Sequence, residues 1–286
     1  MLVGFYTGVS GAYYNEQKLA VTSNNLANAN TTAFKRNVMV FRTRLEEDDT
    51  WRIDPSVKKR LPSFYGVERE GVFQDMGAKG PMVSTGNPMD LSINTNLENA
   101  FFKVKRDVND PTISWTRNGS LGIGLLNPSN PDSPSILTAA GSIILGDNDQ
   151  PIEIDPLAGE LNITPEGIVQ QGKLVIGTLP LYRFDKSQNP LIKQNSNLQS
   201  LMRLGNSLYQ VPPELAREFN PERIVPGEGG VTHLVTQGAQ EGSNVKVINE
   251  MISLINVSKA ATSNVQAMRL QVTGLQKLFQ IVRQGA

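Results

Sequence analysis

Cysteine is absent from the 286-residue chain, and histidine occurs once. The lack of cysteine excludes disulfides, thiolate metal sites and cysteine nucleophiles. Neither sign of charge is in excess, because Lys plus Arg and Asp plus Glu each number 27. Nucleic acid and anionic lipid attract a basic surplus, so we expect neither as the main partner. A balanced charge also permits copies of the chain to associate.

Long apolar runs are missing as well. No window reaches the roughly 18 to 20 apolar residues of a membrane helix, so we expect no direct membrane insertion. The first eight residues lack the basic and continuous apolar regions of a secretory signal. The sequence therefore predicts a cytoplasmic protein, or one exported by a route that needs no cleaved signal.

Motifs that carry chemistry are scarce. His233 has no neighbouring nucleophile or ligand pattern. Residues 147–149 resemble a fragment of a calcium loop but lack the later ligands, and a plain turn is the simpler interpretation. Residues 122–124 lack the third glycine of a nucleotide-binding loop. We expect no catalytic residue, no cofactor and no metal.

One group of acids keeps a rival function open. Glu68, Glu70 and Asp75 could supply the paired carboxylates of a carbohydrate-acting enzyme with helical ends docked on a β domain. Such an enzyme needs two acids that converge in a cleft. Exposed acids are common, and their spacing here does not indicate convergence.

Both ends of the chain predict helices. Residues 8–28 contain no proline. An imperfect apolar stripe of Phe5, Val9, Ala12, Leu19 and Leu26 begins just before this range and runs along it. The C-terminal pattern is longer and advances by four and three residues without a slip, which is typical of a coiled-coil seam. We expect Ser243 or Asn244 to cap this helix. The seam consists of Val247, Met251, Leu254, Ser258, Ala261, Val265, Met268, Val272, Leu275, Phe279 and Val282.

The middle of the chain is rich in proline and turn residues and predicts β structure. The expected strands are 90–93, 100–104, 113–117, 142–145, 167–170, 174–176 and 179–184. The predicted fold is α+β, with paired terminal helices and an inserted, mostly β domain. The expected segments are an N-terminal helix with its following loop (1–40), an extended linker (41–89), a β domain (90–210), a return linker (211–240) and a C-terminal coiled-coil helix (241–286).

Segments near both ends resemble a known family. Residues 23–35, Ser-Asn-Asn-Leu-Ala-Asn-Ala-Asn-Thr-Thr-Ala-Phe-Lys, are similar to the N-terminal signature of bacterial flagellar rod and hook proteins. Residues 240–245, followed by 250–252, resemble the C-terminal signature of that family. Segments 100–104, 115–121, 137–141 and 204–209 match the family in order. The resemblance therefore spans nearly the whole chain.

Three positions depart from the family pattern. Ala33 stands where the family usually has glycine or a similar small residue, and residues 97–99 lack a glycine that often precedes the Phe-Phe pair. Residues 258–262 also differ from the usual run. These departures suggest a divergent lineage, so specific subunit contacts are not carried over from the family.

The resemblance implies a structural protein of the flagellar basal body. Its terminal helices would pair and stack around a central channel, and its partners would be itself and other rod and hook subunits. It would leave the cell unfolded through the flagellar type III export apparatus. The start and the C-terminus resemble the proximal rod subunit most. A distal rod subunit, a short hook-like protein and a non-polymerising scaffold or assembly chaperone remain alternatives.

A physical hypothesis follows for assembly. The C-terminal seam would be poorly covered in one chain, because the N-terminal stripe is shorter and is interrupted by Glu16 and Ser23. Neighbouring subunits would complete its burial, and asparagines would supply lateral hydrogen bonds. A chain without residues 1–35 and 240–286 would remain a soluble β domain. The expected assembly residues are Asn24, Asn25, Leu26, Asn28, Phe34, Ser243, Asn244, Val245, Met251, Leu254, Val265, Met268, Val272, Leu275 and Phe279.

Overall fold

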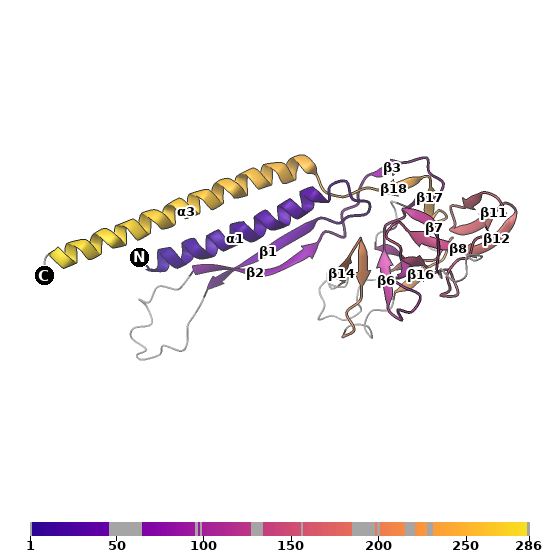
Figure 1. The fold of residues 1–286 in the computed structure, drawn as a ribbon, viewed down its shortest axis with the longest axis horizontal. Coiled ribbons are helices and arrows are strands. Elements are labelled where there is room, and N and C mark those ends of the chain that lie inside the picture. Colours follow the sequence, from indigo (N-terminus) through magenta and orange to yellow (C-terminus); the bar gives the residue numbers. More distant parts are fainter. Residues whose placement is uncertain are drawn as a thin grey trace. The chain divides into compact units, whose positions relative to one another are not determined.

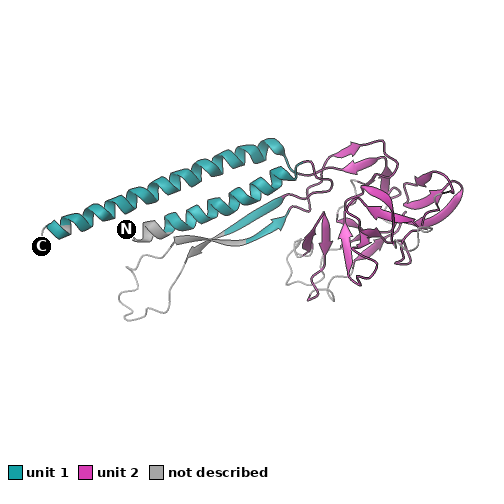
Figure 2. Ribbon diagram, viewed as in Figure 1, with its two compact units in different colours: residues 1–29, 37–74, 245–286 teal, residues 30–36, 75–244 magenta. Residues whose placement is uncertain are grey.

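The computed structural model divides into two compact units (Figure 2). The helical unit comprises residues 1–29, 37–74 and 245–286, and the β unit comprises residues 30–36 and 75–244. The chain therefore passes between the units four times. The structure describes residues 2–45, 65–94, 97, 99–126, 134–155, 157–184, 198, 201–214, 221–227 and 231–284.

The order of the elements confirms the predicted α+β fold (Figure 1). A helix stands at each end, and the strands lie between. The elements are α1 (Leu2–Ala27), β1 (Asn37–Leu45), β2 (Tyr65–Gln74), β3 (Met82–Ser84), β4 (Leu91–Ile93), β5 (Ala100–Lys105), β6 (Ile113–Thr116), β7 (Leu121–Leu125), β8 (Pro134–Thr138), β9 (Ile143–Ile144), β10 (Leu161–Ile163), β11 (Ile168–Gln171), β12 (Leu174–Thr178), β13 (Leu181–Arg183), β14 (Met202–Gly205), β15 (Leu208–Gln210), β16 (Glu222–Ile224), β17 (Val235–Gln237), β18 (Ala239–Glu241) and α3 (Val247–Gln284).

The two helices pack side by side and run antiparallel (Figure 1). A Cβ added at Gly8 would lie 3.0 Å from Met268 Cγ, and one added at Gly11 would lie 3.1 Å from Asn264 Nδ2. Near the other end of α1, Asn25 Nδ2 lies 3.5 Å from Glu250 Oε2. The two glycines thus let the helices approach closely.

Among the side chains of α1 that the structure describes, the buried ones are polar. Asn15, Thr22 and Asn25 are buried, whereas Val9 in the predicted apolar stripe is 43% exposed. The Asn25 side chain forms a two-way bond with Asn37 at the start of β1: its Oδ1 accepts from Asn37 N at 2.8 Å, and its Nδ2 donates to Asn37 O at 3.0 Å. This pair fixes the end of α1 against β1.

β1 and β2 form a long antiparallel hairpin in the helical unit, with an irregularity between Val40 and Phe41. Tyr14 of α1 packs on Phe41, with ring centroids 4.0 Å apart. This hairpin and β3 lie largely in the range 41–89 that was expected to be an extended linker. In the described part of this range, strand pairing satisfies the backbone groups of β1 and β2.

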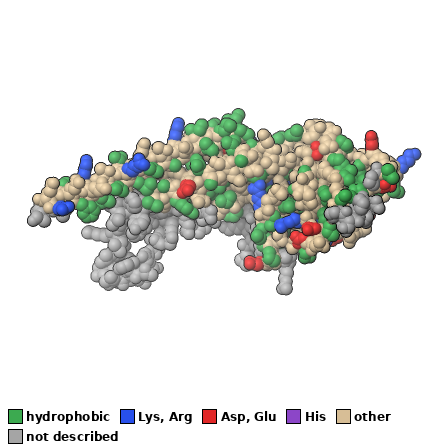
Figure 3. All heavy atoms as spheres, viewed as in Figure 1, with side chains coloured by type: hydrophobic (Ala, Val, Ile, Leu, Met, Phe, Trp, Pro, Cys, Tyr) green, Lys and Arg blue, Asp and Glu red, His purple; other side chains and the backbone are tan. Residues whose placement is uncertain are grey.

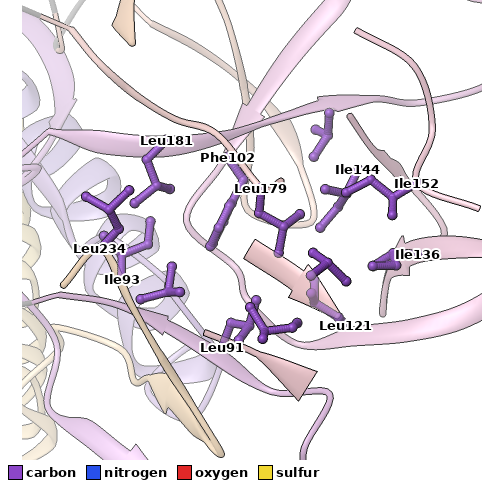
Figure 4. Close-up of a cluster of buried hydrophobic side chains, with 14 of the residues drawn as sticks. Leu91, Ile93, Phe102, Leu121, Ile136, Ile144, Ile152, Leu179, Leu181 and Leu234 are labelled. Atoms are coloured by element: carbon purple, nitrogen blue, oxygen red, sulfur yellow. The ribbon is translucent and has the colours of Figure 1, made fainter. Parts of the chain in front are cut away.

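The β unit is built around a nine-stranded sheet, as far as the chain is described. Its central path is β14-β15-β6-β5-β9-β8-β7, and β13 pairs with both β5 and β16. A three-stranded sheet (β10-β11-β12) and two strand pairs (β17-β4 and β18-β3) complete the unit. Figure 4 shows the main hydrophobic core, in which Phe102, Ile136 and Leu181 are almost completely buried.

Each of the seven predicted strand segments overlaps an observed strand, from β4 to β13. The sequence missed strands whose apolar residues are few or interrupted by glycine, such as β7 and β14. Asn99, just before the Phe-Phe pair, has φ 60°, the left-handed backbone that glycine adopts freely. Asparagine tolerates this conformation better than most residues, so a sharp turn forms here without glycine.

Candidate functional site

The two family-like end segments meet inside the β unit. Residues 30–36, which we call the docked loop, follow α1 and form neither helix nor strand. Three consecutive side chains of this loop, Ala33, Phe34 and Lys35, are at most 2% exposed. Ala33 has φ 55°, which costs a residue with a Cβ roughly 1–2 kcal/mol. The surrounding contacts must therefore hold this loop in place.

A buried charge cluster of Lys35, Arg117 and Glu241 anchors the docked loop. Lys35 Nζ donates to Glu241 Oε1 at 2.8 Å and to the Ala78 carbonyl at 2.9 Å. Arg117 donates to Glu241 Oε2 from Nε at 2.9 Å and from Nη2 at 2.7 Å. Its Nη1 donates to the Ala100 carbonyl at 2.7 Å. All three side chains are at most 6% exposed.

The electrostatics of the charge cluster favour an ionised carboxylate. Burial acts to raise the pKa of Glu241, but the charges of Arg117 and Lys35 and their hydrogen bonds outweigh it and hold the pKa below its ordinary value. Burial lowers the pKa of Lys35, and Arg117 adds to this, whereas Glu241 opposes it. Nearby, burial raises the pKa of Tyr209 to about 12, so its hydroxyl stays protonated. The site therefore holds two cations on one carboxylate.

Asn244 binds three segments where the chain leaves the β unit. Its Oδ1 accepts from Arg36 N at 2.6 Å, and its Nδ2 donates to the carbonyls of Asp75 and Ala78 at 2.9 and 3.0 Å. Asn244 N also donates to the Phe34 carbonyl at 3.2 Å. One amide side chain thus ties the docked loop, the segment after β2 and the segment before α3. Asn244 was expected to cap the C-terminal helix. Because α3 begins only at Val247, Asn244 lies too far before the helix to cap it.

The hairpin formed by β14 and β15 covers the docked loop. The Arg203 guanidinium lies over the Phe34 ring, 4.4 Å from its centroid. Ser207 donates from its hydroxyl to the Thr32 carbonyl at 3.2 Å. Asn206 and Ser207 form the two-residue turn with φ 50° and 58°, as a type I′ hairpin requires. The turn geometry thereby points the Ser207 hydroxyl at the loop.

Gly80 is required by a close backbone approach beside the charge cluster. A Cβ at this position would lie 1.8 Å from the Gly242 carbonyl oxygen. Gly242 N donates to the Pro81 carbonyl at 2.8 Å, which brings the two segments together. Gly80 N also lies 3.4 Å from Glu241 Oε1. The glycine thus lets the 78–81 segment reach β18.

The expected N-terminal assembly residues occupy different environments. Asn25 is buried, and its side chain forms hydrogen bonds with Asn37 within the chain. Asn28 Nδ2 donates to the Asn24 carbonyl at 2.8 Å, and Asn24 Oδ1 accepts from Asn37 Nδ2 at 3.1 Å. Leu26 is half-buried. Phe34 belongs to the core of the β unit rather than to a helix surface.

The expected C-terminal assembly residues divide into a buried start and an open helix. Ser243 and Val245 are buried, and Asn244 is half-buried. Leu254, Met268 and Leu275 are half-buried on α3. The other expected assembly residues on α3 are more open: Met251 is 49% exposed, Val265 and Val272 39%, and Phe279 72%.

The remaining features are a cavity, the single histidine and the two aspartates of residues 147–149. A cavity of ≈ 360 Å³ in the helical unit is lined by Lys18, Asn249, Ile252, Ser253, Asn256 and Val257. His233 is exposed. Asp147 and Asp149 each form an ion pair, with Arg223 and Lys103 respectively.

Within the described residues, no group of three or more His, Cys, Asp or Glu side chains could hold a metal ion. The side chains of Glu68 and Glu70 lie outside the described residues. Among the helices that the structure describes, none combines the length and the apolar character needed to span a membrane.

Sequence reasoning did not single out Lys35, Arg117 or Glu241. All three lie in or beside the segments that resembled the family, which was the available signal. Their pairing spans 206 residues for Lys35 and 124 residues for Arg117. No local sequence pattern predicts a contact between residues so far apart.

Comparisons with known proteins agree with the resemblance. A family model described as "Flagella basal body rod protein" matches residues 5–35. The chain is 29% identical over 263 residues to the flagellar basal-body rod protein FlgF of Caulobacter vibrioides, covering 92% of this chain and 91% of that protein. It is 30% identical to the flagellar basal-body rod protein FlgG of Buchnera aphidicola subsp. Schizaphis graminum, covering 98% and 100%. It is 24% identical to the FlgG of Bacillus subtilis, covering 99% and 100%.

Proposed function

Because this chain belongs to the family of flagellar basal-body rod proteins, we propose that it is a structural subunit of the flagellar rod and catalyses no reaction. The observation that carries the proposal is the match of rod proteins along almost its whole length. The carbohydrate-acting enzyme considered from the sequence receives no support, since these relatives are rod proteins. The place of action is the flagellar basal body.

Assembly would use the open surface of the terminal helices. In Figure 3, hydrophobic side chains are visible along the helical unit. Ile248 is 73% exposed, Ile252 53% and Leu270 74% on α3. Each large apolar side chain that becomes fully buried contributes roughly 1.5–3 kcal/mol. A few such residues shared between neighbours are enough to drive association.

The contact between neighbours would be heterologous. A contact between two different patches of the same chain repeats without closing and builds a helical filament. The partners are further copies of this chain and other rod and hook subunits. The filament would transmit torque and form the wall of the export channel.

The route to the rod is the flagellar type III export apparatus. The chain would pass through it unfolded, without a cleaved signal peptide, and would fold at its destination. The relatives carry both names, FlgF and FlgG. The proximal position on the rod, with the distal position next, stays a prediction.

Electron microscopy of basal bodies from cells lacking this chain tests the proposed function. We expect a missing or truncated rod, and the length of the remaining stub gives the position of the subunit. Cells that carry the gene again on a plasmid serve as the control and should regain a complete rod. A complete rod and hook without this chain would contradict the proposal.

A further inference from the structure

We propose that the docked loop is a closing latch, which becomes ordered only when residues 240–244 reach the β unit. Both ends of the β unit would then become structured together, as its last folding step. The latch follows from the partners of the loop, from its buried charges and from its backbone conformation. The proposal concerns the single chain, and its meaning for rod assembly rests on the proposed function.

The partners of the docked loop lie far along the chain. Ala33 N donates to the Glu241 carbonyl at 2.8 Å, and Thr32 Oγ1 lies 3.1 Å from Gln240 Oε1. Lys35 reaches Glu241 across 206 positions, and Arg36 N reaches Asn244 across 208. Residues 240–244 therefore supply a large part of the site in which the loop lies.

The loop cannot hold this conformation by itself. It has neither helical nor strand structure, and the backbone of Ala33 adopts the left-handed conformation. Fixing each backbone residue costs roughly 1–2 kcal/mol. Burial of Phe34 and the bonds to residues 240–244 offset this cost, and they exist only after docking. Without those residues, the loop should remain disordered.

The order of events follows from the lengths of the chain segments that must close. β5 and β6 pair across one short connection, as do β7 and β8. The latch contacts close a segment of more than 200 residues, as the separation of 206 positions between Lys35 and Glu241 shows. Contacts between residues far apart in sequence carry a larger entropy cost and are therefore expected later.

Buried charge makes the closing step all-or-none. Arg117 comes from the end of β6, Glu241 from β18 and Lys35 from the docked loop. A partly closed state would leave a desolvated cation beside an incomplete set of partners, which is strongly unfavourable. The loop, β18 and Asn244 should therefore dock as one unit.

Pulse-labelling hydrogen exchange during refolding of the full wild-type chain tests the latch. We expect the amides of Ala33 and Asn244 to become protected in one phase, at least tenfold slower than the amides of β5 and β6. Protection of Ala33 together with β5, or before it, would overturn the proposal. Protection of Ala33 in a phase separate from that of Asn244 would overturn it as well.

A variant pair adds a native-state measurement. Asn244→Ala should raise amide exchange of Ala33 at least tenfold while β5 stays protected, and Asn148→Ala, in an exposed turn, should leave both unchanged. Unchanged exchange of Ala33 in Asn244→Ala would contradict the latch. These experiments use the isolated chain, so their failure leaves the rod function untouched, and a normal rod in cells lacking the chain leaves the latch untouched.

Discussion

Lys35 Nζ lies 2.8 Å from Glu241 Oε1, although 206 positions separate the two residues. The contact joins the segment that follows the first helix to the segment that precedes the last one. Arg117 shares the same carboxylate, so Glu241 is the common anion of two buried cations. Two buried cations therefore depend on one side chain for their counter-charge.

Glu241→Gln should be among the most destabilising single changes in this chain. It leaves Lys35 and Arg117 buried without their carboxylate, which typically costs about 3–5 kcal/mol. Urea unfolding of the full chain measures the loss. Glu160→Gln, at an exposed position, is the matched control and should stay within about 0.5 kcal/mol. Equal stability of the two variants would show that the charge cluster is dispensable.

The ionised carboxylate of Glu241 should make the stability of the folded chain depend on pH. The pKa of Glu241 is lower in the folded chain than its ordinary value. The stabilisation that Glu241 contributes is therefore complete above its unfolded pKa of about 4.3, and it is lost as pH falls through the folded pKa. The free energy of unfolding should fall more steeply with acid in the wild type than in Glu241→Gln. Parallel pH profiles would argue against this coupling.

Gly80→Ala should disrupt the β unit through a backbone collision, because the new Cβ would lie 1.8 Å from the Gly242 carbonyl oxygen. Neither backbone can yield without breaking the bond between Gly242 N and Pro81 O. We expect a loss of several kcal/mol, on the order of the largest single-residue effects. Gly77→Ala is the control, since its Cβ meets nothing within 4 Å. Similar thermal midpoints for the two variants would contradict the prediction.

Phe279→Asp should block assembly but leave the single chain folded. Phe279 is 72% exposed, so a charge there adds little cost before association. In an interface, an unpaired carboxylate is strongly unfavourable. Gln280→Asp, at the next exposed position, is the control. Circular dichroism should show two folded chains, and electron microscopy should show rods for Gln280→Asp alone; rods built by Phe279→Asp would remove this residue from the interface.

The isolated β unit should need more of the chain ends than the sequence suggested. A chain of residues 36–239 lacks Glu241 and leaves Arg117 desolvated without its anion. Residues 30–244 keep the docked loop, this pair and the Asn244 contacts to Asp75 and Ala78. We therefore expect the longer chain to be more stable by about 3–5 kcal/mol in urea. Equal stability would restore the shorter boundary.

Local patterns explain which parts of the fold could be predicted. Apolar residues recur at helical spacing in both terminal segments, and α3 begins at Val247, the first residue of the predicted seam. The face of α1 could not be predicted, because Asn15, Thr22 and Asn25 are buried by contacts with other elements. A periodic search for apolar residues overlooks a buried polar stripe.

The candidate site was only partly visible in the sequence. The family-like segments include the docked loop and residues 240–244, which the structure brings together in the β unit. Their meeting point in the β unit, and the pairing of Lys35 with Glu241, depend on strand pairings across most of the chain. Ala33 shows the same limit, since its left-handed backbone is imposed by contacts that local sequence does not encode.

The four passages of the chain between its units have a consequence for backbone cleavage. They lie at residues 29/30, 36/37, 74/75 and 244/245. The backbone therefore joins the two units covalently at four places. Asn244 binds Arg36 and Asp75, the residues that flank two of these places, and itself flanks a third. Cleavage of the backbone at any one of these four places would therefore leave the two units covalently joined through the other three.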